Sequence, residues 1–392
     1  MGRAALVVLF GLGVRSIRLP LDHGWRERRL ERYQPSEGSA TSIWRKVILG
    51  VAALALVAGL GYVGYVGYEG SRQLVEGGGS DRDCRTPDVH FGWAYEAINY
   101  DIADDALLKT RNADLTNCSY IGTPAGSEVV TDDGIRIAGW YVPAADGAGP
   151  TAPTVVLVHG FGATKVGILK YGEGLHQHFN LVAFDMRNAG RSTGTVTTAG
   201  VLEQKDLRAV LDWLVATKHP SHIGVLGNSL GAATALAEAG DDQRVEALAL
   251  DSMHTRIRFQ VEARLEENGH PAYPGTWAIF VGMRIRTGVD IGAADAADTI
   301  GKIGARPVML THGTADTQDL PARTQTFYDQ ALADGVNIEL HWCEGSGHNA
   351  PAGMPAEACR ADFATWVSDF FTGALTRHLG ARMPELDAVA AS

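Results

Sequence analysis

The sequence predicts an α/β protein with a mostly parallel eight-stranded sheet flanked by helices, preceded by a membrane-spanning helix. Two observations lead to this prediction. Beyond residue 150, short β-prone runs alternate with helical patterns, which is typical of a parallel sheet wrapped by helices. Before it, residues 47–66 form an uncharged apolar run. The 392 residues exceed what a single core usually needs, so one large domain with added segments is expected.

The apolar run is expected to be a membrane anchor. A helix rises about 1.5 Å per residue, so some 20 apolar residues cross the roughly 30 Å hydrocarbon core. Eight Arg and Lys residues lie between positions 15 and 46, and Trp44, Tyr62, Tyr65 and Tyr68 flank the run like interfacial anchors. The positive-inside rule then predicts a single-pass protein of the cell membrane, with a cytoplasmic N-terminus and the main domain outside.

Two other interpretations compete for this apolar run. A buried core helix would usually be shorter than a membrane span. A cleaved signal peptide is the stronger alternative, but a long polar arm precedes the run and no clear small-x-small cleavage site follows Tyr68. We therefore expect an uncleaved signal anchor.

The composition sets limits on the partners. The net charge of −11 and the lack of a basic cluster in the C-terminal part exclude nucleic-acid binding, which requires clustered Lys and Arg. Residues 59–64 match the dinucleotide pattern G-x-G-x-x-G, but they lie in the apolar run with no preceding strand, so this match is dismissed. No Cys and His spacing matches a zinc site, and no cofactor is expected.

The rest of the chain divides by composition and pattern. Three consecutive glycines indicate a flexible linker in residues 71–83, and residues 88–120 are interpreted as a helical extension over part of the sheet. The predicted segments are a basic cytoplasmic arm (1–42), the anchor (43–68), a linker and N-terminal extension (69–125), the main domain (126–375) with a cap at 253–306, and a C-terminal tail (376–392).

Individual elements follow from local patterns. Asp133-Gly134 joins β-prone runs 128–131 and 135–142 and is a strong hairpin signal. Residues 201–217 carry apolar side chains at helical spacing. Six buried strands are expected at residues 154–158, 181–184, 223–226, 247–250, 308–311 and 338–342.

The strongest chemical signal is G-N-S-L-G at residues 227–231. It follows a predicted strand and precedes an Ala-rich helix former at 232–239. Two glycines permit a sharp turn without side-chain clashes, so the hydroxyl of Ser229 would project from the sheet edge near a helix N-terminus. The other interpretation, an ordinary helix N-cap, does not explain the two glycines.

A serine nucleophile needs a base and an acid that orients the base. His348 lies in a loop directly after the last predicted strand, and Asp316 follows the strand before it. Asp251, after an earlier strand, is the alternative acid. The oxyanion of a tetrahedral intermediate would need two N–H donors, predicted to be the backbone amides of Leu230 and Phe161.

These motifs resemble those of the α/β-hydrolase superfamily, in particular its bacterial serine esterases and peptidases. The resemblance covers roughly residues 128–373. It rests on five landmarks in the family's order, H-G-F-G (159–162), D-M-R-N-A-G-R-S (185–192), G-N-S-L-G (227–231), H-G-T-A-D (312–316) and G-S-G-H (345–348).

The resemblance implies a membrane-anchored serine hydrolase that cleaves a small-molecule or peptide acyl compound through Ser229, Asp316 and His348. It also implies that His159 and His312 are structural, and that Asp185, Arg187 and Ser192 brace loops, with substrate contact by Arg187 as an alternative. A cofactor-free perhydrolase or haloperoxidase with the same three residues, and a binding module without activity, remain open, as does the oligomeric state.

The cap at 253–306 offers candidates for a substrate pocket. Its Tyr273, Trp277, Phe280 and Met283 are expected either to line an apolar acyl pocket or to pack the cap onto the sheet. Esterase, thioesterase, lipase and peptidase activities all fit such a pocket.

The four cysteines predict two disulfides if the domain is exported. Cys343 is expected to pair with Cys359, and Cys84 with Cys118. Cys343 ends the last predicted strand and Cys359 opens a final helix expected at residues 356–371, which must pack back beside that strand. Unbridged buried thiols are the alternative.

Overall fold

The computed structural model describes residues 37–80, 86–98, 128–348 and 357–376. The chain forms two compact units, Met1–Val57 and Ala58–Ser392. In the first unit the described residues belong to the start of helix α1 (Glu37–Glu76), and all other elements lie in the second unit.

The second unit is built on a sheet of eight strands in the order β1-β4-β6-β5-β7-β8-β9-β10. Every neighbouring pair from β6 to β10 is parallel, while β4 pairs antiparallel with both β1 and β6. The strands are β1 (Glu96–Ile98), β4 (Gly139–Val142), β5 (Thr154–Val158), β6 (Asn180–Phe184), β7 (Ile223–Asn228), β8 (Ala247–Asp251), β9 (Val308–Gly313) and β10 (Ile338–Cys343). The predicted α/β-hydrolase arrangement is confirmed, and each of the six strands expected beyond residue 150 is found within two residues of its expected ends.

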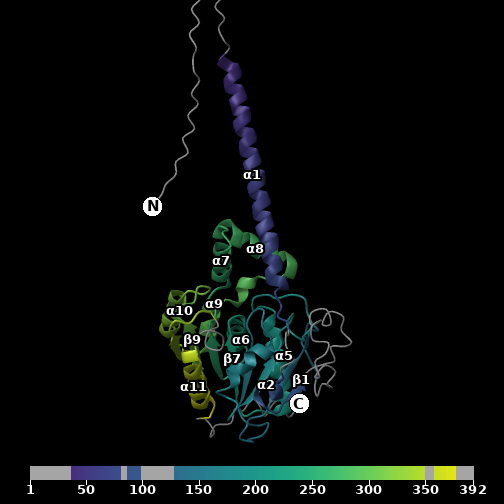
Figure 1. Ribbon diagram of the computed structural model, residues 1–392, viewed down its shortest axis with the longest axis vertical. Helices are drawn as coiled ribbons and strands as arrows, with labels where there is room; N and C mark the ends of the chain where they lie inside the picture. Colours follow the sequence, from purple (N-terminus) through teal and green to yellow (C-terminus); the bar gives the residue numbers. More distant parts are fainter. Residues whose placement is uncertain (1–36, 81–85, 99–127, 349–356, 377–392) are drawn as a thin grey trace, which may run out of the picture. The chain divides into compact units, whose positions relative to one another are not determined.

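Two helical layers cover the sheet (Figure 1). Helices α5 (Glu203–Lys218), α6 (Leu230–Asp241) and α10 (Pro321–Ala333) contribute apolar side chains to the core on one face. Helices α4 (Lys165–Ile168) and α11 (Glu357–Leu375) contribute Ile168, Phe371 and other apolar side chains to the second core cluster. Burying each large apolar side chain contributes roughly 1.5–3 kcal/mol, which holds the strands in register.

The N-terminal extension differs from the prediction. Its described part holds only a short helix, α2 (Pro87–Phe91), followed by β1, which pairs with β4 and forms an edge of the sheet. The interpretation of residues 88–120 as a helical extension is therefore wrong for residues 92–98; residues 99–120 lie outside the described residues. The predicted hairpin is confirmed, since β2 (Val129–Val130) pairs antiparallel with β3 (Arg136–Ile137).

The cap lies between β8 and β9, where the sequence places it. It consists mainly of α7 (Ile257–Glu267), α8 (Ala272–Thr287) and α9 (Ala296–Thr299). Apolar side chains of α7 and α8 form a third core cluster, which also includes Val66 and Val75 of α1. The last turns of α1 are therefore part of the cap's core.

Helix α1 contains the apolar run expected to be the anchor. Ser42–Glu76 is long and apolar enough to cross a membrane. Its last turns pack closely on α8, because a Cβ at Gly67 would lie 2.8 Å from the carbonyl oxygen of Ala278, and one at Gly282 would lie 2.5 Å from Ser71 Oγ. Only residues without a side chain allow the two helices to approach this closely.

The three glycines after α1 do not form the expected flexible linker. Added Cβ atoms would overlap the ring of Phe161 at Gly77, and backbone atoms of neighbouring loops at Gly78 and Gly79. Gly79 also accepts a hydrogen bond from the amide of Gly190 at 2.8 Å. The prediction of a linker is therefore wrong for residues 71–79, because these residues are helical or packed against the domain.

One of the two expected disulfides is present. Cys343 at the end of β10 is bonded to Cys359 in the first turn of α11, with the two Cα atoms 5.6 Å apart. The expected partners Cys84 and Cys118 lie outside the described residues.

The Cys343–Cys359 bridge is predicted to stabilise the domain. It closes a loop of about 16 residues, and such a restraint on the unfolded chain contributes about 3 kcal/mol. Urea denaturation of the detergent-solubilised chain should show a lower free energy of unfolding for the Cys343→Ala/Cys359→Ala variant. Reductant should destabilise the wild type and leave the variant unchanged; a wild type that is insensitive to reductant would contradict the prediction.

Candidate active site

The site is organised by a sharp turn between β7 and α6. Ser229 occupies this turn with φ 51° and ψ −114°, a strained conformation for a residue with a side chain. A Cβ at Gly227 would overlap the backbone of α6, and one at Gly231 would overlap the carbonyl oxygen of Val158. The chain can therefore turn here only with glycine at both positions, as the motif predicted.

Ser229, His348 and Asp316 come together at the carboxyl edge of the sheet. Ser229 Oγ lies 3.0 Å from His348 Nε2, and His348 Nδ1 lies 2.7 Å from Asp316 Oδ2. The backbone amides of Gln318 and Asp319 both donate to Asp316 Oδ1, at 2.8 and 2.9 Å. These two hydrogen bonds fix the carboxylate so that its second oxygen faces the imidazole.

The surroundings shift the pKa values of Asp316 and His348 in opposite directions. Burial favours neutral Asp316, but the hydrogen bond and charge of His348 outweigh it and lower the pKa of the carboxyl. Burial alone would lower the pKa of His348, whereas the hydrogen bond to Asp316 and the carboxylates of Asp316, Asp251 and Asp319 raise it above its ordinary value. An ionised carboxylate thus faces an imidazole that readily accepts a proton.

The two residues predicted to carry the oxyanion donors, Leu230 and Phe161, line the same cavity as Ser229. Leu230 is the first residue of α6, where backbone N–H groups lack intrahelical acceptors. Phe161 follows β5, and the same pocket is lined by Phe161, Ser229, Leu230 and His348. The loop after β5 lies close to Ser229, since a Cβ added at Gly160 would be 3.4 Å from Ser229 Cβ.

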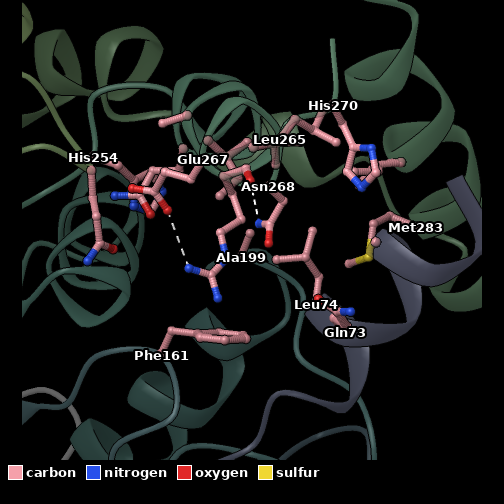
Figure 2. A pocket seen from close by; sticks show the side chains of 18 of the residues that line it. Gln73, Leu74, Phe161, Ala199, His254, Leu265, Glu267, Asn268, His270 and Met283 are labelled. Carbon is pink, nitrogen blue, oxygen red and sulfur yellow. Dashed lines mark hydrogen bonds and ion pairs between the residues drawn. The ribbon is translucent and has the colours of Figure 1, made fainter. Parts of the chain in front are cut away.

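A cavity of about 480 Å³ opens from Ser229 and His348. Its walls come from α7, α8 and, unexpectedly, the last turns of α1, which contribute Gln73 and Leu74 among others (Figure 2). Its volume falls within the usual range for small-molecule sites. No pattern in the sequence indicates that α1 takes part in a pocket.

Two of the four predicted cap residues take one of the expected roles, and two take neither. Met283 lines the cavity and points toward it (Figure 2). Phe280 is half-buried and packs on the cap's core. Tyr273 and Trp277 are 83% and 61% exposed, so the expectation that they line the pocket or pack the cap is wrong.

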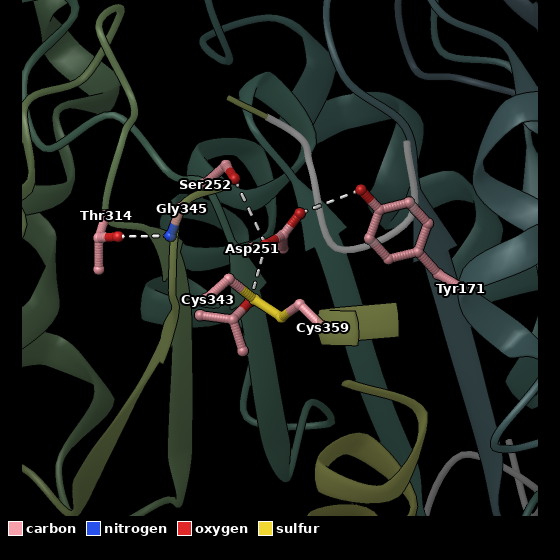
Figure 3. The surroundings of a disulfide bond; sticks show 8 residues. Tyr171, Asp251, Ser252, Thr314, Cys343, Gly345 and Cys359 are labelled. Atoms are coloured by element: carbon pink, nitrogen blue, oxygen red, sulfur yellow. Dashed lines mark hydrogen bonds between the residues drawn. A yellow bond between two sulfur atoms is a disulfide. The ribbon is translucent and has the colours of Figure 1, made fainter. Parts of the chain in front are cut away.

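Asp251, the alternative acid, is bonded elsewhere. Its carboxylate accepts hydrogen bonds from Tyr171 Oη at 3.0 Å, Asn228 Nδ2 at 2.8 Å and Thr311 Oγ1 at 2.7 Å. Figure 3 shows Tyr171 pointing toward Asp251, with the disulfide nearby. Burial raises the pKa of Asp251, and these donors only partly offset it. The buried Asp251 carboxylate therefore links its own strand, β8, to Asn228 of β7 and Thr311 of β9.

The other landmark residues brace the loops around the site. His159 Nδ1 lies 2.8 Å from the carbonyl oxygen of Gly160, and its Nε2 accepts a hydrogen bond from the amide of Met186 at 3.0 Å. His312 Nε2 lies 2.8 Å from the carbonyl oxygen of Asp319.

The charged landmark residues are likewise buried in ion pairs. Asp185 pairs with Lys165 at 2.5 Å, and Arg187 pairs with Asp206 and Asp133, both at 2.8 Å. Ser192 Oγ donates to the carbonyl oxygen of Asp185 at 2.6 Å. These partners favour the bracing roles over substrate contact by Arg187.

Sequence reasoning missed two buried titratable residues near the site. His254, which lines the cavity, has its pKa lowered to about 4 by burial and by the charge of His348. Burial, with the Asp316 carboxylate nearby, raises the pKa of Asp319 to about 7. Neither residue belongs to a motif, so only the fold could identify them. In the described part of the chain, no group of three or more His, Cys, Asp or Glu side chains is placed to hold a metal ion.

Sequence comparison matches residues 153–283 to the family model of the α/β hydrolase fold. The uncharacterized protein YfhR of Salmonella typhimurium is 29% identical over 218 residues, which cover 51% of this chain and 68% of that protein. The uncharacterized protein YqkD of Bacillus subtilis is 28% identical over 202 residues, covering 50% of this chain and 65% of the relative.

Among solved structures, the esterase Pf2001 of Pyrococcus furiosus is similar with a TM-score of 0.57. It is 19% identical, and the match covers 77% of this chain and 98% of the esterase. At this identity the likeness shows a common fold. By the family match and the arrangement of its sheet, the chain has the α/β-hydrolase fold.

Proposed function

We propose that the protein is a serine hydrolase that cleaves a carboxylic ester, thioester or amide through an acyl-enzyme on Ser229. The observation that carries this proposal is the hydrogen-bonded series Ser229, His348 and Asp316 beside a cavity of about 480 Å³ that Ser229 and His348 line. An ester is the favoured substrate class, which agrees with the esterase activity named for the similar Pyrococcus furiosus structure.

The proposed reaction has two half-reactions. His348 Nε2 removes the proton from Ser229 Oγ as this oxygen attacks the acyl carbon, and the same proton then passes to the leaving alcohol, thiol or amine. A water molecule, deprotonated by His348, attacks the acyl-enzyme and releases the acid. Asp316 keeps the imidazole in the tautomer with Nε2 free and stabilises its positive charge.

The backbone amides of Leu230 and Phe161 are proposed to stabilise the oxyanion of each tetrahedral intermediate. One such preorganised donor contributes roughly 3–4 kcal/mol to the stability of the transition state. Packing of Gly77 against the ring of Phe161 supports this role, because it restricts the loop that carries the second amide.

We also propose that α1 anchors the protein in the cell membrane as a single-pass helix, with the N-terminus cytoplasmic and the catalytic domain outside. The long apolar stretch of α1 and the basic residues before it support this topology. No nucleic acid or cofactor enters the proposed reaction.

Replacement of Ser229 by Ala should abolish ester hydrolysis, because it removes only the attacking oxygen. Turnover of a short-chain p-nitrophenyl ester should fall roughly 10⁴-fold or more. Ser221→Ala, at an exposed surface position, is the control and should keep full activity. Retention of more than a tenth of wild-type turnover by Ser229→Ala would refute the assignment.

The two candidate acids can be separated by isosteric substitution. Asp316→Asn should lower kcat by about 10⁴-fold, whereas Asp251→Asn should cost far less. Because the Asp316 carboxylate raises the pKa of His348, the acidic limb of the kcat/KM profile should lie above pH 6.5 in the wild type. In Asp316→Asn the acidic limb should move to lower pH. A larger loss of kcat in Asp251→Asn than in Asp316→Asn would assign the acid to Asp251.

The proposed topology predicts that protease added to intact cells removes the catalytic domain but spares the N-terminal arm. Antibodies against a tag at each end of the chain would report the two fragments. Complete protection would mean the inverted orientation, and a soluble form beginning near residue 71 would mean that the anchor is cleaved.

A further inference from the structure

Exposed apolar side chains gather on one helix of the cap. Outside α1, nine large apolar side chains are exposed in the described part of the chain, and four of them lie on α8. Trp277, Val281 and Ile285 are spaced four residues apart, so they follow one side of the helix, and they are 61%, 37% and 80% exposed. Tyr273, which is 83% exposed, lies at a kink in the first turn, where the backbone is not helical. Soluble proteins rarely leave such a continuous apolar face uncovered.

The opposite side of α8 is fixed to α1. Gly67 packs on Ala278, and Gly282 packs on Ser71, so the two helix backbones are in close contact. Arg286 donates to Ser71 Oγ at 3.0 Å, and Tyr62 Oη lies 2.7 Å from His270 Nδ1, just before α8 begins. The apolar face of α8 is therefore held rigidly beside the outermost turns of α1.

These outermost turns carry exposed apolar side chains of their own. Leu60 is 63%, Tyr62 41% and Tyr65 61% exposed, and all three belong to the same compact unit as the cap. The proposed membrane span ends near Val66, so the cap lies beside α1 at the point where the helix would leave the bilayer. A tyrosine and a tryptophan on α8 are the residues that prefer this interfacial depth.

The charge of α8 also fits a membrane surface. Arg284 is 70% exposed, and its guanidinium lies 3.9 Å from the exposed carboxylate of Asp290, so it is open to lipid headgroups. Arginines beside an apolar face are typical of helices that lie in the headgroup region of anionic membranes.

The cavity connects this region to the proposed nucleophile. Its lining includes Tyr65 and Val66 at the membrane end of the domain, Ile279 and Met283 of α8, and finally Ser229. Along α1 the lining runs from Tyr65 to Leu74, a rise of about 13 Å. Figure 2 shows Met283, Leu265 and Leu74 around this space, so the walls offer apolar contacts to an extended chain.

We infer that α8 lies on the lipid bilayer into which α1 is inserted, and that the cavity takes a long-chain acyl ester directly from that bilayer. This inference rests on the proposed function and specifies its substrate class. The acyl chain would occupy the cavity along α1, α7 and α8, with its ester carbon at Ser229. Hydrolysis would leave a free fatty acid and the alcohol of the lipid.

Contact between α8 and the bilayer can be measured without catalysis. The full chain is reconstituted into phosphatidylcholine vesicles containing brominated lipid, which quenches tryptophan only at short range. Wild type should lose a larger fraction of its tryptophan emission than Trp277→Phe. The control Trp93→Phe, which removes a ring stacked between Phe91 and His176, should not reduce the quenched component. Equal quenching of wild type and Trp277→Phe would overturn the inference, and a dimer in detergent would then assign this face to a second copy.

The substrate class is tested by comparing two esters in the same vesicles. Val281→Asp/Ile285→Asp should lower kcat/KM at least tenfold for a long-chain p-nitrophenyl ester dissolved in the bilayer, and less than twofold for a soluble short-chain ester. Val89→Asp/Leu332→Asp, at exposed positions outside the cap, should change neither rate. Unchanged rates on both esters would overturn the inference.

Two outcomes separate this inference from the proposed function. A wild type that hydrolyses neither ester would refute the hydrolase proposal, and a chain that does not float with the vesicles would refute the anchor. If Val281→Asp/Ile285→Asp loses both activities equally, the cap has been damaged. The quenching of Trp277 then decides by itself whether α8 contacts the bilayer.

Discussion

The sharp turn at Ser229 is the constraint on which the site depends. It holds a side-chain-bearing residue at positive φ, and it is possible only because Gly227 and Gly231 leave room for the adjacent backbones. The amide of Ser229 donates to the carbonyl oxygen of Asp251, which ties the turn to the neighbouring strand. Since β7, β8, β9 and β10 are parallel, their carboxyl ends meet at one edge, and the loops after β9 and β10 bring Asp316 and His348 to Ser229.

Helix α1 is more than a long apolar helix, because its last turns are part of the folded domain. Its last turns supply part of the cavity wall and part of the cap's core, and the glycines that follow pack against the loop of Phe161. Asn188 Nδ2 donates to the carbonyl oxygen of Val75, which fixes the end of the helix to the domain. The segment proposed as the anchor therefore also shapes the cavity beside Ser229.

The sequence predicted the sheet, and the side chains that meet at its edge, for physical reasons. Parallel strands are buried on both faces, so they appear as short continuous apolar runs between helical patterns. The turn at Ser229 requires glycine at two positions, and this requirement is visible as a motif. The residues predicted for the site, Ser229, His348 and Asp316, lie within hydrogen-bonding distance of one another in series, and Phe161 and Leu230 lie beside them.

What the sequence did not reveal depends on tertiary contacts. Strand β1 has only three residues at a sheet edge, too few to show a pattern. Consecutive glycines are equally compatible with a flexible linker and with close packing, and only the neighbouring loops decide between them. The direction of Trp277 depends on which side of α8 packs on α1, and the burial of His254 depends on the cap above it. None of these contacts is local in sequence.

Covalent labelling tests the central claim most directly. The detergent-solubilised chain is treated with a fluorophosphonate, digested, and mapped by mass spectrometry. Formation of a single adduct on the peptide containing Ser229, blocked by prior incubation with a slowly hydrolysed ester, is the predicted result. An unlabelled Ser229, or an adduct on a different residue with full loss of activity, would contradict it.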